Sequence, residues 1–120
     1  MKNIITIVLL VFATTIATAQ VSENTAVIKK LKNAKYEIAV NGNCDLCKKR
    51  IEKAAFTVSG VKSAGWDVDS QMLSLLINED KTSATEVEVA VAKAGHDTKN
   101  VKATADAYSN LHNCCQYKRL

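Results

Sequence analysis

The 120-residue sequence predicts an α+β fold in one small domain. Short apolar segments alternate with polar residues in the manner of strands, and a longer segment places its apolar residues at helical spacing. Turn residues separate these segments. The order strand, helix, strand occurs and then recurs along the chain, which suggests two halves of one fold.

The N-terminus has the features of a secretory signal peptide. Lys2 precedes an apolar run at residues 4–13, and small residues lead to Ala17-Thr18-Ala19. This layout predicts a signal peptide over residues 1–19, cleaved after Ala19, and the apolar run is short for a transmembrane span. An uncleaved membrane anchor is the alternative. We expect an exported, periplasmic protein without stable membrane insertion after cleavage.

Residues 20–35 are polar and lysine-rich, and they are interpreted as an N-terminal leader or a short loose helix. The alternating segment at 36–40 predicts the first strand, and Asn41-Gly42-Asn43 is a typical turn. Apolar residues then recur at helical spacing over 45–58. Ser59-Gly60 predicts the end of that helix, because glycine tolerates the left-handed cap conformation.

Two further strands are predicted at 61–68 and 72–77, joined by a hairpin-type connection. From its residues alone, segment 85–94 is ambiguous, because it alternates like a strand but also has apolar residues at helical spacing. A last short strand is predicted at 98–101. Residues 103–111 can form one more helix before the chain reaches its terminal cysteines.

Cys44 and Cys47 are the most informative residues of the chain. Their C-x-x-C spacing places two thiols on the turn that leads into the first predicted helix. A helix N-terminus stabilises negative charge, so it lowers the thiol pKa and favours the thiolate that binds soft metals. Redox motifs and zinc sites use the same spacing, which leaves those alternatives open.

The predicted order of elements and this cysteine loop together resemble the heavy-metal-associated domain. That family includes copper chaperones, the N-terminal domains of metal-pumping ATPases and periplasmic mercury-binding proteins. Besides the cysteine pair, the resemblance rests on three segments, which read KKRIEKA at 48–54, VSGV at 58–61 and AGHDT at 94–98.

The resemblance implies a ferredoxin-like βαββαβ sandwich over residues 36–102 with a short C-terminal extension at 103–120. It also implies a helix at 85–94. Two positions depart from the family's usual loop. Asn41 stands where the family has glycine, and Gly42 stands where it has a methionine that packs under the loop.

Two thiolates on a loop near solvent suit Cu(I), a soft ion that accepts low coordination numbers. Such a site can bind tightly yet release rapidly, because a partner's thiolate adds before an old one leaves. Hg(II), Zn(II) and Cd(II) are alternatives, although structural zinc usually takes four closed ligands. The expected partners are the metal ion and a metal-transporting membrane protein or another metal carrier.

Four more residues are candidate ligands. The resemblance places His96 in a loop near the metal; an exposed loop histidine is its alternative role. The C-terminal extension adds His112, Cys114 and Cys115. These could form a second soft-metal site, close over the C-x-x-C pair or form disulfides, although adjacent cysteines rarely bridge each other.

Other functional classes have less support. The net charge of +4 is small and the basic residues are not interleaved with aromatic residues, so no nucleic-acid partner is expected. No paired carboxylates or serine nucleophile motif indicates an enzyme. A thiol-disulfide redox protein is the main alternative, but the chain contains no proline and therefore no cis-proline beside the thiols. A structural module whose cysteines are all disulfides is a third class.

Overall fold

The computed structural model describes residues 27–119; the predicted signal peptide and residues 20–26 of the leader lie outside them. The elements are β1 (Ala34–Ala39), α1 (Asp45–Phe56), β2 (Val61–Asp67), β3 (Met72–Ile77), α2 (Ala84–Lys93), α3 (Ala105–Ser109) and the 3₁₀ helix η1 (Asn113–Cys115).

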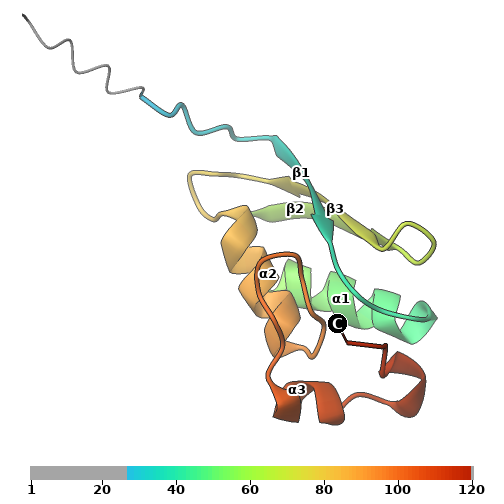
Figure 1. Cartoon of the computed structure of the whole chain (residues 1–120). Helices are drawn as coiled ribbons and strands as arrows, with labels where there is room; N and C mark the ends of the chain where they lie inside the picture. The colour runs from blue at the N-terminus through green and yellow to red at the C-terminus, as the bar shows by residue number, and fades with distance from the viewer. Residues whose placement is uncertain (1–26, 120) are drawn as a thin grey trace, which may run out of the picture.

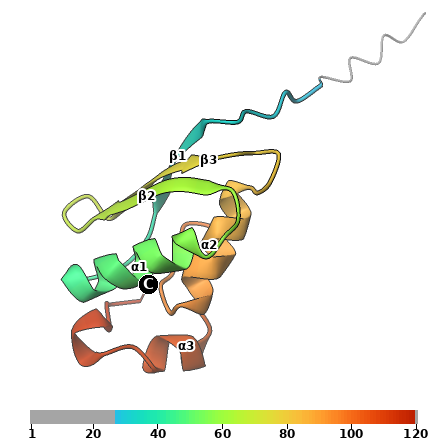
Figure 2. The same cartoon turned by 180° about the vertical axis from the view of Figure 1, so that it is seen from behind.

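The described residues form a layered α+β fold, which confirms the predicted class. The sheet is antiparallel with strand order β1-β3-β2. Helices α1 and α2 lie on one side of this sheet, and α3 with the rest of the C-terminal extension lies beyond them, on the side away from the sheet (Figures 1 and 2). The extension therefore packs against the helices, outside the two-layer sandwich of sheet and helices.

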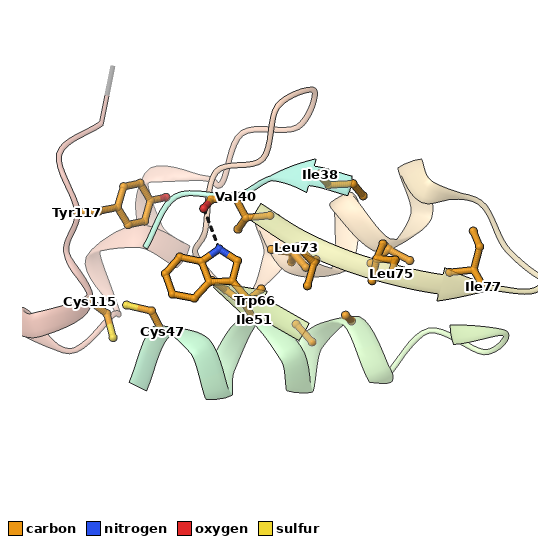
Figure 3. Packing of buried hydrophobic residues seen from close by; sticks show 14 of the residues in the cluster. Ile38, Val40, Cys47, Ile51, Trp66, Leu73, Leu75, Ile77, Cys115 and Tyr117 are labelled. Atoms are coloured by element: carbon orange, nitrogen blue, oxygen red, sulfur yellow. Dashed lines mark hydrogen bonds between the residues drawn. The ribbon is translucent and has the colours of Figure 1, made fainter. Parts of the chain in front are cut away.

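The core lies between the sheet and the two longer helices (Figure 3). Alternate strand residues face it, and Leu73 of β3 pairs with Ile38 on one side and Trp66 on the other. Each large apolar side chain buried here stabilises the fold by about 1.5–3 kcal/mol. The fully buried members of this core include Trp66, Ile51, Leu73, Ile77, Val87 and Val91.

Helix α2 resolves the ambiguous segment. A capping box begins it, because the Ser83 side chain accepts a hydrogen bond from the Glu86 N–H while the Glu86 carboxylate accepts one from the Ser83 N–H. Val87 and Val91 face the core, whereas Val89 is exposed. The helix implied by the family resemblance is confirmed.

The prediction of a strand at 98–101 is wrong. The structure shows an isolated bridge there, between Val40 and Thr98. The Thr98 N–H donates to the Val101 carbonyl (2.8 Å), so the chain turns back on itself. The Glu88 carboxylate accepts bonds from the Thr98 hydroxyl and the Asn100 N–H. These bonds replace most of the ladder that a fourth strand would make.

The N-terminal boundary also differs slightly from the prediction. Strand β1 begins at Ala34, two residues before the predicted start, and residues 27–33 contain no helix. Within residues 27–119, no helix has the length and apolar character needed to cross a bilayer.

Candidate metal centre

Cys44 and Cys47 lie where the chain passes from the loop after β1 into α1. Cys44 is the N-cap residue of α1, so its thiol lies at the positive end of the helix. Cys47 is one turn further and is fully buried. The Asn43 N–H donates to the Cys47 sulfur at 3.3 Å, which holds that sulfur against the loop.

All four cysteines are free thiols, and the fold gathers them at this point. The Cys44 Sγ lies 3.6 Å from that of Cys47, 3.6 Å from that of Cys114 and 3.7 Å from that of Cys115. The ligand atoms of Cys44, Cys47 and Cys115 all lie within 4.8 Å of one another. The structure thus places the terminal cysteines beside the C-x-x-C pair.

The thiols of the cluster differ in acidity. Donation from the Cys47 backbone N–H is the largest influence on Cys44 and lowers its pKa to about 7. Burial raises the pKa of the Cys115 thiol far above its usual range, and the bond to Cys44 raises the pKa of Cys114. Near neutral pH, Cys44 is therefore the thiol closest to ionisation among these three.

Tyr117 and Arg119 fix the C-terminal extension to the domain. The Tyr117 hydroxyl accepts from the Asp97 N–H (2.7 Å) and donates to the Gly95 carbonyl (2.9 Å). The Arg119 guanidinium donates to both oxygens of the buried Asp97 carboxylate, at 2.9 and 2.7 Å. Burial alone would raise the pKa of Asp97, but the bonds from Arg119 and the Ala103 N–H lower it.

Comparisons with known proteins agree with this geometry. No protein-family model matches the sequence, and no curated protein matches it. Among solved structures, the apo form of the copper chaperone of Enterococcus hirae is 30% identical, with a TM-score of 0.50, over 54% of this chain and 96% of that one. The chain belongs to the heavy-metal-associated domain family.

Two other solved structures are similar to this chain. The N-terminal domain of a potential copper-translocating P-type ATPase from Bacillus subtilis, in a Cu(I)-loaded state, is 28% identical with a TM-score of 0.53. The match covers 56% of this chain and 85% of that domain's chain. Oxidized MerP from Ralstonia metallidurans CH34 shares the fold at 24% identity and a TM-score of 0.53, over 56% of this chain and 94% of that one.

The departure at Gly42 has a structural explanation in this heavy-metal-associated domain. A Cβ atom at Gly42 would lie 3.0 Å from the Cys47 Cβ and 3.0 Å from two ring carbons of Trp66. The Trp66 indole is fully buried and donates to the Val40 carbonyl at 3.0 Å (Figure 3). Trp66 thus fills the space under the loop, where the family resemblance implies a methionine.

The two histidines lie outside the group of sulfur atoms. His96 is fully buried, not exposed; it stacks on Tyr117, and its Nδ1–H donates to the Asn41 carbonyl at 2.8 Å. Burial lowers the pKa of His96, and its Nε2 is the one buried side-chain nitrogen or oxygen without a partner within residues 27–119. His112 is an exposed residue at the N-cap of η1. Among residues 27–119, the ligand group found here includes neither.

Several residues that position the site cannot be recognised from the sequence. Gln71 holds the cysteine loop through two hydrogen bonds. Its side-chain oxygen accepts one from the Gly42 N–H (2.9 Å), and its backbone carbonyl accepts one from the Val40 N–H (2.9 Å). Tyr117 and Arg119 hold the extension. The closeness of Tyr117 to Cys115 in sequence is a weak indication that Tyr117 helps to position Cys115. Nothing in the sequence indicates that Arg119 pairs with Asp97.

Proposed function

We propose that this protein binds and carries a soft metal ion through Cys44 and Cys47, and that the ion is Cu(I). The proposal rests on two sulfurs 3.6 Å apart at a helix N-terminus, one of them in a thiol whose pKa is about 7. Thiolates select soft ions, and Cu(I) accepts the small number of ligands that this loop offers. The protein's role is binding and transfer, not catalysis.

The similar structures support this choice of cargo. A copper chaperone and a Cu(I)-loaded ATPase domain are among them. Hg(II), which the family resemblance also admits, is the alternative to test. Zn(II) and Cd(II) are also alternatives to test, because structural zinc usually takes four ligands and four thiols meet here. We further propose that a metal-transporting membrane protein or another carrier receives the ion by thiolate exchange.

Export to the periplasm is part of the proposal. It depends on the signal-peptide pattern at residues 1–19, and the four cysteines must then be kept reduced in an oxidising compartment. Mass spectrometry of the protein recovered from the periplasmic fraction should give an N-terminus at Gln20. Recovery of the intact chain from the membrane fraction would instead support an uncleaved anchor.

The direct test is a competitive titration of reduced protein against a chromogenic Cu(I) chelator. We expect one tight equivalent for the wild type and loss of tight binding in Cys44→Ser and in Cys47→Ser, with folding retained by circular dichroism. An exposed serine variant such as Ser63→Ala is the control for the substitution itself. Wild-type affinity in both cysteine variants would contradict the assignment.

One observation favours a second candidate, thiol-disulfide exchange. Cys44 has a pKa of about 7 and three other sulfurs within 3.7 Å, so a disulfide from Cys44 needs little movement. The absence of proline from the sequence argues against the usual redox site. Equilibration with glutathione buffers separates the candidates: a redox protein should exchange rapidly without metal, whereas a carrier should be protected from oxidation by Cu(I).

A further inference from the structure

We propose that Cys115 is a third thiolate ligand, so that Cys44, Cys47 and Cys115 form one closed three-sulfur metal site. This inference rests on the proposed function, because it assumes that the C-x-x-C pair binds the metal. It assigns the C-terminal extension a role in coordination, beyond the two ligands that the C-x-x-C motif supplies.

The geometry of the thiols is the first argument. Figure 3 shows Cys47 on α1 and Cys115 on the extension, with the Cys47 sulfur pointing toward Cys115. Cys44 Sγ lies 3.6 Å from Cys47 Sγ and 3.7 Å from Cys115 Sγ. With metal–sulfur bonds of about 2.3 Å, a trigonal site needs sulfurs about 4.0 Å apart, whereas a linear two-sulfur site needs about 4.6 Å. The spacing is closer to the trigonal site.

Burial is the second argument. Cys47 and Cys115 are both fully buried, although they come from segments far apart in the sequence, while Cys44 is half-buried at the solvent edge. A metal bound among the three would be shielded from solvent on the side of Cys47 and Cys115. An exchanging thiolate from a partner would then approach past Cys44.

The fold already holds Cys115 in place. Two residues after it, Tyr117 is buried with both hydrogen bonds of its hydroxyl made, and four residues after it Arg119 pairs with the buried Asp97. The Cys115 N–H donates to the His112 carbonyl at 2.7 Å within η1. Because these contacts order the segment before metal arrives, binding a third thiolate requires little further loss of chain entropy.

Cys114 provides a matched control beside it. Its sulfur lies 3.6 Å from that of Cys44 and 4.0 Å from that of Cys115, but the residue is exposed. The ligand group within 4.8 Å combines Cys115, not Cys114, with the C-x-x-C pair. The two adjacent cysteines therefore differ in burial and position, and the same serine substitution can be made at each.

The test uses protein expressed from the full-length chain, reduced, freed of reductant and loaded anaerobically with one equivalent of Cu(I). X-ray absorption counts the sulfur neighbours, and a chelator titration gives the affinity. We expect three sulfurs in the wild type and in Cys114→Ser, and two in Cys115→Ser. The affinity of Cys115→Ser should fall at least about tenfold, since even outer-shell partners of metal ligands are commonly worth that much.

Three sulfurs in monomeric Cys114→Ser identify Cys115 as the third ligand even if Cys115→Ser fails to fold. Two sulfurs in the wild type, three retained in a folded Cys115→Ser, or a copper-bridged dimer would overturn the inference. Failure of the proposed function looks different: the wild type would bind no Cu(I) tightly, or Cys44→Ser would keep wild-type affinity.

Discussion

At the scale of single residues, the cysteine loop depends on a close contact between a glycine and a tryptophan. Gly42 lies over the Trp66 ring, and Trp66 bonds to the Val40 carbonyl at the end of the first strand. The loop N–H groups are meanwhile held by Gln71 and by the Asp97 carbonyl. These contacts therefore hold the loop that bears the sulfur atoms, although the methionine of the usual family loop is absent.

This contact predicts that Gly42→Ala destabilises the protein by roughly 1–3 kcal/mol, because the added methyl group overpacks a filled site. Gly65→Ala is the matched control. A Cβ atom at Gly65 meets nothing within 4 Å, so that change should be neutral or slightly stabilising in a strand. Urea unfolding of the reduced, metal-free proteins measures both. Equal stability of the two variants would show that the close contact with Trp66 does not constrain Gly42.

At the scale of elements, the start of α2 is fixed by its capping box. Ser83→Ala removes the side-chain oxygen that accepts from the Glu86 N–H, so we expect a loss of about 1 kcal/mol in the free energy of unfolding. Ser63→Ala, at an exposed position of β2, should change stability by much less. Thermal unfolding of the two variants is the measurement. Similar melting temperatures would mean that α2 does not depend on this cap.

The same helix shows what the sequence could and could not predict. Helix α1 was predictable because Cys47, Ile51, Ala54 and Ala55 form a single buried face at helical spacing. Helix α2 was ambiguous because a buried glutamate and an exposed valine imitate strand alternation. Glu88 is buried because its carboxylate binds Thr98 and Asn100, ten or more residues later. Those same bonds replace the predicted fourth strand, and the sequence around Glu88 gives no indication of them.

At the scale of the whole molecule, the sequence identified the two cysteine pairs and left their meeting as one of several alternatives. The C-x-x-C pair was predictable from local spacing before a helix. The approach of Cys115 depends on Tyr117 reaching Gly95 and on Arg119 reaching Asp97, which are contacts between segments with no shared sequence pattern. Only the folded chain brings these partners together.

The ion pair between Arg119 and Asp97 makes attachment of the extension dependent on pH. The pKa of Asp97 is below its ordinary value of 3.8 in the folded protein, so the folded state favours the charged carboxylate. The stability from this group is fully present above about pH 4 and is lost as the pH falls through the lower folded-state pKa. Removing the charge should therefore lower the free energy of unfolding most near neutral pH, and progressively less as the pH falls.

We accordingly expect Asp97→Asn to destabilise the protein clearly at pH 7, and the difference from the wild type to shrink between about pH 4 and pH 2. Urea unfolding at a series of pH values measures this difference directly. Asp69→Asn, at an exposed position of the β2–β3 hairpin, is the control and should have a small effect throughout. Since Asp97 also holds the segment that bears Cys115, alkylation of Cys115 should be faster in Asp97→Asn at pH 7. A difference that stays constant down to pH 2 would mean that the charge of Asp97 does not fasten the extension.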